Sequence, residues 1–206
     1  MIEFISFISD PETFSVEWKS LSQPGPGERE SHATCTSSEG QMYISGGKTG
    51  TEVPTLLQDV WRLSVVSVAD SPDPLVWEHL KALQLPEPRC VHGMCAGGDS
   101  KLYVFGGFTG DMPGDLLSAN VTTTEEEAST RNAWETISVA PEGRVGLSMC
   151  SVSPALVQRL TSSNLYSPLF RNQPTTEAST TNILIFGGST MEKDLGDIWL
   201  LRKKTV

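Results

Sequence analysis

The sequence predicts an all-β protein built from repeated units of four short strands. Three observations support this: a pattern of Trp, Arg and Gly-Gly that recurs three times, β-branched and aromatic runs that end at each glycine pair, and a composition rich in turn residues. The chain has 206 residues, including 18 Gly and 13 Pro, and 38% are hydrophobic. This length and composition are typical of one folded domain or a small pair of domains. They argue against a collagen-like protein and against a chain that is disordered throughout.

Each copy of the repeat opens with a tryptophan and reaches its glycine pair by way of an arginine. The arginine follows the tryptophan by 10 to 12 residues, and copies are spaced by close to 60 residues where nothing is inserted. The recurring residues are Trp18, Trp77 and Trp134, then Arg29, Arg89 and Arg144, then Gly46 with Gly47, Gly106 with Gly107 and Gly187 with Gly188.

The runs between these anchors predict four strands per copy. The segments 31–37, 91–97 and 145–151 are small and apolar and predict an inner strand, and 42–47, 102–107 and 183–188 predict a buried second strand that ends at the glycines. A third strand starts after Asp59, Asp115 and Asp197, and the tryptophan lies in a fourth. Segment 75–85 spaces its apolar residues like a helix, but its register with the other copies predicts an outer strand followed by a loop.

These residues resemble the kelch repeat: Arg opens the innermost strand, Tyr-x-x-Gly-Gly forms the second, Asp precedes the third, and Trp lies in the outer fourth. The resemblance covers nearly the whole chain and implies four-stranded blades of a β-propeller. Tyr43 and Tyr103 occupy the tyrosine position, whereas the third copy has Leu184. The second copy has Leu117 where the others have Trp61 and Trp199, a change expected to weaken packing without altering the fold.

The repeat sets the predicted domain organisation. Residues 1–21 form half a blade with its third and fourth strands, 29–80 and 89–138 form complete blades, and 144–202 form a blade without its fourth strand. The third blade carries an inserted loop, 154–181, and a second low-complexity stretch, 122–130, links two strands of the second blade. About three blades cannot close a ring, so we expect the missing blades from a longer chain or from a second copy.

Charge and composition exclude several classes of function. The formal charge of −10 disfavours a nucleic-acid interface, and no apolar run is long enough to span a bilayer. The first ten residues lack the features of a signal peptide, which favours a cytoplasmic or nuclear protein with reduced thiols.

Arg29, Arg89 and Arg144 are the main candidate binding residues. They are expected near one rim of the channel, where they either grip an acidic peptide of a partner or pair with carboxylates or carbonyls inside the fold; we favour internal pairing. His32 and His92 are equivalent to one another and join the candidate rim, although the third copy has Leu147 there.

The cysteines fall into two groups. Cys35, Cys95 and Cys150 each follow the repeat arginine by six residues and are expected to serve packing, whereas Cys90 is a weak candidate for a reactive thiol.

The sequence therefore predicts a non-catalytic interaction module that binds another protein through rim loops, as an adaptor or substrate receptor, with no catalytic residues, metal or cofactor. The alternative is a propeller that forms part of an enzyme: an oxidase, an epimerase, a specifier-type protein or an appendage to an RNA-modifying methyltransferase. No nucleophile elbow, phosphate-binding loop or paired-carboxylate motif supports this alternative.

Overall fold

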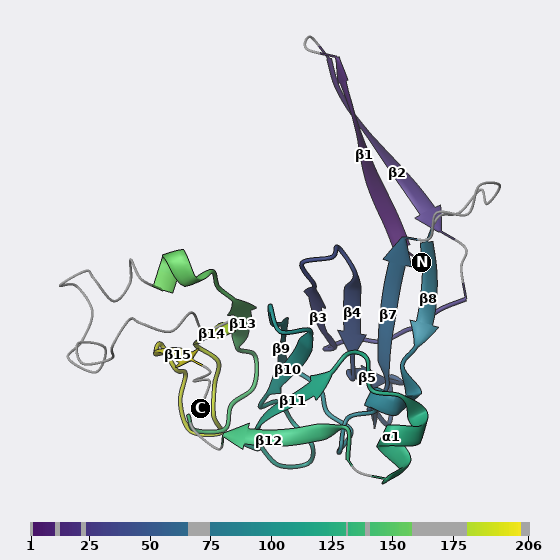
Figure 1. The fold of residues 1–206 in the computed structure, drawn as a ribbon. Helices are drawn as coiled ribbons and strands as arrows, with labels where there is room; N and C mark the ends of the chain where they lie inside the picture. Colours follow the sequence, from purple (N-terminus) through teal and green to yellow (C-terminus); the bar gives the residue numbers. More distant parts are fainter. Residues whose placement is uncertain are drawn as a thin grey trace.

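A computed structural model describes residues 2–10, 13–21, 24–65, 75–130, 132–138, 141–157 and 181–202, with the backbone alone in the first two segments. Nearly all of their regular secondary structure is antiparallel sheet, as predicted, and the sheets do not close into a ring (Figure 1). No helix within the described segments is long and apolar enough to cross a membrane.

Two four-stranded sheets share one strand order. The first sheet runs β3 (Ala33–Thr36), β4 (Met42–Ser45), β7 (Val60–Val65) and β8 (Leu75–His79), and the ribbon of β5 (Lys48–Thr49) and β6 (Thr55–Leu56) lies between its second and third strands in the chain. The second sheet runs β9 (Gly93–Ala96), β10 (Lys101–Phe105), β11 (Leu116–Asn120) and β12 (Trp134–Ser138). In both sheets each strand pairs with the next main strand in sequence.

The remaining strands form two smaller sheets. The third sheet contains β13 (Ser148–Ser151), β14 (Asn182–Phe186) and β15 (Ile198–Arg202). At the N-terminus, β1 (Ile2–Asp10) and β2 (Thr13–Leu21) form a hairpin. In Figure 1 this hairpin extends away from the body of the molecule, at the side opposite the third sheet.

The strands predicted before the glycine pairs are confirmed as β4, β10 and β14. The strand predicted around Trp77 is also confirmed, because β8 pairs with β7 in register and places Trp77 opposite Leu63. Of the segment with helix-like spacing, only Lys81–Leu83 is helical: these residues form a short 3-10 helix, η1, just after the strand.

The low-complexity stretch 122–130 lies between β11 and β12, as predicted, and part of it forms helix α1 (Glu125–Thr130), which the sequence analysis did not predict. A capping box starts the helix: the Glu127 backbone N–H donates to Thr124 Oγ1 at 3.2 Å, and the Thr124 N–H donates to Glu127 Oε2 at 2.9 Å. The Thr-x-x-Glu spacing of this signal is visible in the sequence.

The inserted loop predicted at 154–181 lies mostly outside the described residues, which stop at 157 and resume at 181. The structure describes both edges of this insertion. Residues 154–157 form a helical turn with Val157 buried, and Thr181 is buried beside the second strand of the third sheet.

Alternation along the strands gives each sheet two apolar faces, and these pack face to face. Between the first and second sheets, Tyr43 and Val60 pack in one cluster with Met94, Val104 and Trp134. Between the second and third sheets, Phe105 and Leu116 pack with Ile183 and Ile185, among others. The core therefore lies at the junctions between sheets, and the loops are left at the two ends.

The glycine pairs are required by backbone geometry at these junctions. Gly46 and Gly47 have φ of 55° and 97°, and the other two pairs have nearly the same angles. The N–H of Gly47 donates to the carbonyl of Arg89 in the next sheet at 2.9 Å, and a Cβ on Gly46 would lie 2.4 Å from the same oxygen. Only glycine combines a positive φ with so close an approach.

Candidate functional site

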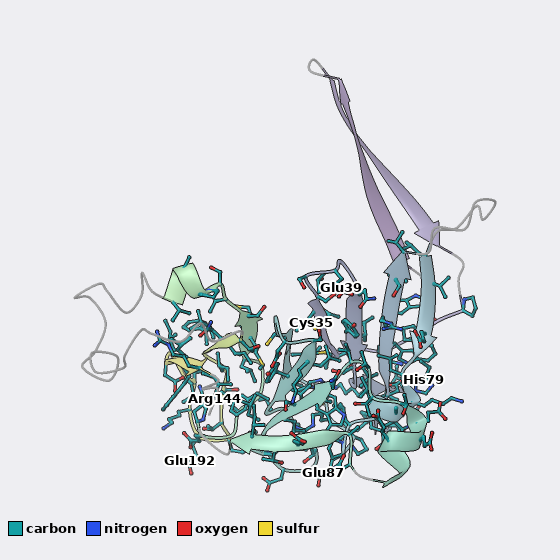
Figure 2. All side chains as sticks on the ribbon, in the orientation of Figure 1. Cys35, Glu39, His79, Glu87, Arg144 and Glu192 are labelled. Carbon is teal, nitrogen blue, oxygen red and sulfur yellow. The ribbon has the colours of Figure 1, made fainter. Side chains whose placement is uncertain are left out.

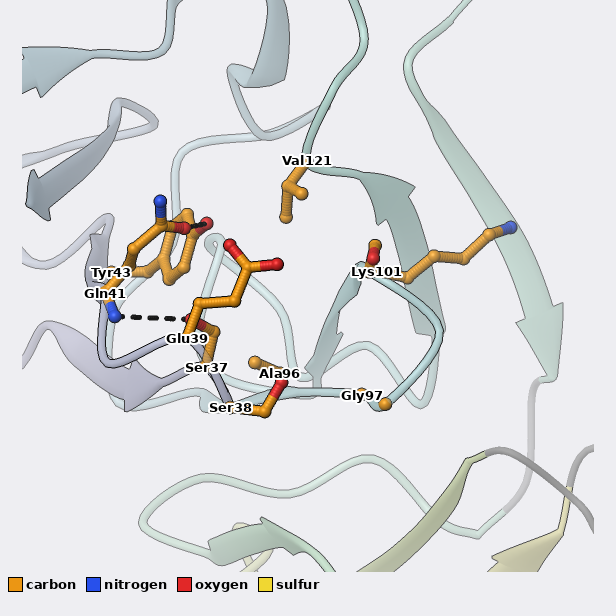
Figure 3. Close-up of a pocket in the computed structure, with 11 residues that line it drawn as sticks. Ser37, Ser38, Glu39, Gln41, Tyr43, Ala96, Gly97, Lys101 and Val121 are labelled. Carbon is orange, nitrogen blue, oxygen red and sulfur yellow. Dashed lines mark hydrogen bonds between the residues drawn. The ribbon is translucent and has the colours of Figure 1, made fainter.

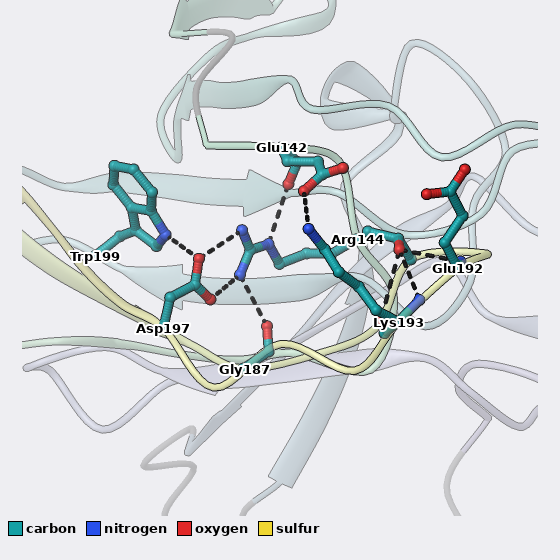
Figure 4. A network of polar contacts seen from close by, with 8 residues as sticks. Glu142, Arg144, Gly187, Glu192, Lys193, Asp197 and Trp199 are labelled. Atoms are coloured by element: carbon teal, nitrogen blue, oxygen red, sulfur yellow. Dashed lines mark hydrogen bonds and ion pairs between the residues drawn. The ribbon is translucent and has the colours of Figure 1, made fainter.

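The three repeat arginines make the same contacts in all three sheets. Each guanidinium donates to both oxygens of the aspartate before the third strand and to the carbonyl of the first glycine. In the second sheet, Arg89 donates to the two carboxylate oxygens of Asp115 at 3.1 Å each and to the Gly106 carbonyl at 3.0 Å. Arg29 binds Asp59, and Arg144 binds Asp197 in the same way (Figure 4).

Burial shows that these arginines serve the fold. The side chains of Arg89 and Arg144 are 1% exposed and that of Arg29 is 7% exposed. A buried guanidinium that already binds a carboxylate bidentately has few free, accessible N–H donors for a partner protein. This geometry favours internal pairing over the hypothesis that these side chains grip an acidic peptide.

Indole groups strengthen two of the three aspartate sites. Trp61 Nε1 donates to Asp59 at 2.6 Å, and Trp199 Nε1 donates to Asp197. Burial alone would raise the pKa of Asp59, but the hydrogen bonds from Arg29 and Trp61 outweigh it and lower that pKa below its ordinary value. The hydrogen bond from Arg144, with a smaller contribution from Trp199, lowers the pKa of Asp197. In the second sheet Leu117 replaces the tryptophan, so Asp115 has no indole partner at this position.

The two candidate histidines differ in their surroundings. His92 is buried at the first junction, where its Nε2 and Ser45 Oγ are 2.8 Å apart. Burial lowers the pKa of His92 to about 3. His32 is exposed and packs against Gly47, the second glycine of its own sheet. His92 therefore belongs to the core of the junction, which argues against a place on a binding rim.

The cysteines also occupy equivalent places. Cys35, Cys95 and Cys150 stand opposite Tyr43, Tyr103 and Leu184, as their common spacing from the arginines predicts. Burial raises the pKa of Cys35 to about 12. Cys90, the weak candidate for a reactive thiol, is 4% exposed, and burial raises its pKa as well, so this prediction is not supported. All four thiols are free.

A groove of about 470 Å³ opens on the second sheet beside the Arg89–Asp115 pair. Its walls include loop residues 86, 87 and 89, loop residues 113–115 and residues of strand β12. Its side chains include two carboxylates and an amide: it is lined by Glu87, Arg89, Asp115, Leu117, Asn132, Trp134 and Thr136, among others. In Figure 2, Glu87 and Arg144 lie toward one end of the molecule, and Cys35 and Glu39 lie toward the other.

The groove lies where the first sheet has two stacked rings. Trp61 pairs with His79 across β7 and β8, and their ring centroids are 4.6 Å apart. The same register in the second sheet pairs Leu117 with Thr136. Both of these smaller side chains line the groove, so the loss of two rings accounts for the open space.

A second pocket, between the turns of the first and second sheets, is much smaller. It measures about 40 Å³ and is lined by Glu39, Tyr43 and Lys101, among others (Figure 3). This space suits a few water molecules. Within the described part of the chain, no group of three or more His, Cys, Asp or Glu side chains could hold a metal ion.

Sequence reasoning identified the arginines and glycines of this region but not the groove. Glu87, Asn132 and Thr136 lie outside the repeat pattern. The available signal was the replacement of tryptophan by Leu117, which was interpreted as a packing change alone. Pairing Leu117 with Thr136 requires the register of β12, which contains a shift between Leu116 and Leu117.

No family model matches this chain. It is similar to Kelch domain-containing protein 10 of rat, with 27% identity over 81% of this chain and 33% of that protein, and to the mouse protein of the same name, with 27% identity over 30% of its length. It is also similar to Adagio-like protein 1 of rice, with 32% identity over 61% of this chain and 19% of that protein. The chain thus spans about a third or less of the curated relatives it matches. Together with the all-β architecture, these similarities support a distant relation to kelch-like proteins.

Proposed function

We propose that this chain is a non-catalytic, kelch-like interaction module that binds a peptide segment of another protein in the groove of the second sheet. The observation that carries the proposal is the replacement of the stacked Trp61–His79 pair by Leu117 and Thr136, which opens the groove at a loop-lined end of the sheet. Loops presented by a rigid scaffold are the usual place for binding residues. The similarity to proteins named for a kelch domain agrees with an interaction role.

The charges of the groove favour a basic segment over the acidic one first expected. Asp115 and Glu87 contribute two carboxylates, and the charge of Arg89 is already matched by Asp115. One carboxylate therefore remains in excess, on a chain whose formal charge is −10. A lysine or arginine of the partner would gain a charge-assisted hydrogen bond there.

Peptide selection tests the proposal. The wild-type chain is used to select binders from a random peptide library, and the affinities of the selected peptides are then measured by fluorescence anisotropy. We expect peptides with a basic residue and an affinity that falls as salt concentration rises, because a charge pair contributes. Glu87→Gln should weaken these peptides more at low salt than at high salt.

A variant that fills the groove provides the decisive comparison. Leu117→Trp combined with Thr136→His reproduces the pair of the first sheet and should reduce affinity at least about tenfold, which corresponds to about 1.4 kcal/mol. Val53→Trp, on a loop residue that is 82% exposed, is the control and should bind as the wild type does. Equal binding by the filled variant would refute the groove as the site.

The enzyme alternative has its own test. Metal analysis of the purified chain should find no stoichiometric copper or iron, and a stoichiometric metal would overturn the non-catalytic proposal.

A further inference from the structure

The third sheet exposes a face that is buried in the other two sheets. Immediately before the glycine pair, Ser45 and Phe105 are 0% exposed, whereas the equivalent Phe186 is 52% exposed. At the start of the third strand, Val60 and Leu116 are at most 1% exposed, whereas the equivalent Ile198 is 55% exposed. Phe186 pairs with Ile198, so the two side chains lie on one face of the sheet.

The junction between the first and second sheets shows one way in which this face is covered. In the first sheet it carries Tyr43 and Val60, which pack against the second sheet in a cluster that includes Ala119 and Trp134. Trp134 also donates from its indole N–H to the carbonyl of Leu83 at 3.0 Å, across the junction. A strand pair with tryptophan in its outer strand is thus one element that seats against this face.

The N-terminal hairpin is a strand pair of the same kind. Tryptophan pairs with the third strand at the same place in each unit: Trp77 with Leu63, Trp134 with Ala119 and Trp18 with Ile5. Phe7 pairs with Val16, two residues along, so Ile5, Phe7, Val16 and Trp18 fall on one face of the hairpin. In the second sheet the equivalent face carries Ala119 and Trp134, and it packs against the first sheet.

The pairing of the hairpin strands leaves its apolar face without a sheet of the described residues packed on it. Among the described residues, β1 and β2 pair only with each other, and a two-stranded hairpin on its own is marginally stable in water. The hairpin and the third sheet also lie on opposite sides of the molecule (Figure 1).

We propose that the chain forms a head-to-tail dimer in which the hairpin β1–β2 of each copy packs on the exposed face of the third sheet of the other. The occupant of that face is a second copy of this chain. The hairpin-to-sheet contact occurs twice, so the closed pair has two-fold symmetry: each residue of one copy meets its counterpart's partner residue in the other.

Light scattering coupled to size exclusion tests the proposal on the full chain at micromolar concentration. We expect twice the chain mass of 22.3 kDa for the wild type. Ile198→Asp, on the sheet face, and Ile5→Asp, on the hairpin face, should each shift the mass to that of one chain. Ile198 is exposed within the chain, so circular dichroism should show that its variant remains folded.

Mixing the two variants distinguishes this arrangement from other dimers. The Ile198→Asp copy keeps an intact hairpin and the Ile5→Asp copy keeps an intact sheet, so an equimolar mixture should recover a dimer through one contact. Met191→Asp, on a loop residue that is 78% exposed, is the matched control and should remain a dimer.

A wild-type chain with the mass of one copy would overturn the proposal and would indicate a face reserved for a further sheet of a longer polypeptide. A mixture that stays at the mass of single chains would overturn it as well, because two like faces in contact could not be complemented in this way.

Discussion

Removing Asp115 should destabilise the protein more than removing its partner Arg89. The Arg89 side chain is 1% exposed, whereas that of Asp115 is 24% exposed. In Asp115→Ala the buried guanidinium keeps only the Gly106 carbonyl, and breaking a buried pair in this way costs about 3–5 kcal/mol. In Arg89→Met the methionine fills much of the volume and the carboxylate can rehydrate, so the cost should be that of the lost hydrogen bonds, about 1–3 kcal/mol.

Urea unfolding followed by tryptophan fluorescence measures both costs, after a check that fluorescence and circular dichroism give coincident transitions. For a chain of this length, the melting temperature should fall by about 2–4 °C per kcal/mol. Glu142→Ala is the control: its pair with Lys193 spans 3.7 Å between exposed side chains, and its loss should cost less than about 1 kcal/mol. If Arg89→Met proves the more costly variant, or if Asp115→Ala behaves like the control, the account of the arginines as buried framework is wrong.

Three further predictions follow from individual side chains. Burial lowers the pKa of His92 to about 3, so below about pH 6.5 the unfolded chain takes up a proton that the folded chain does not. The free energy of unfolding should therefore fall by up to about 1.4 kcal/mol for each unit by which the pH decreases. His92→Leu should reduce this pH dependence in urea titrations between pH 6.5 and 5. Thr124→Ala removes the cap of α1 and should cost about 1 kcal/mol in urea unfolding, whereas Thr124→Ser should cost much less. Iodoacetamide should label exposed Cys150 well before buried Cys90 and Cys95 in the folded chain, as peptide mass mapping will show; labelling of Cys90 first would contradict the structure.

Much of the fold was predictable because the repeat constrains the backbone. The glycine pairs, the buried second strands and the outer strand at Trp77 follow from positions that recur in every copy. Register with the other copies outweighed the helical spacing of residues 75–85, since strand pairing and burial override local propensity. Helix α1 was missed although Thr124 and Glu127 carry its signal, because the acidic stretch was interpreted by its composition alone.

The candidate site was less predictable because it depends on differences between copies. Arginine, aspartate and glycine recur together, and the structure uses all three within the fold. The groove arises where one copy lacks a ring at two positions, Leu117 and Thr136, that are separated in sequence and joined only by cross-strand pairing. An alignment of the repeats shows that Leu117 replaces a tryptophan, but it does not show that Thr136 is the residue paired with it.

The same argument explains how polar residues are placed at the junctions. Ser45 meets His92 at the first junction, and the equivalent positions at the second junction hold Phe105 and Leu147. A hydrogen-bonded pair has thus been replaced as a unit by an apolar pair, which avoids leaving one buried polar group without a partner. Replacing only one member, as in Ser45→Phe, should therefore be far more costly than replacing both. Positions that change together across a junction report packing constraints. The changes at Leu117 and Thr136, by contrast, leave an open groove, which is why we propose the binding site there.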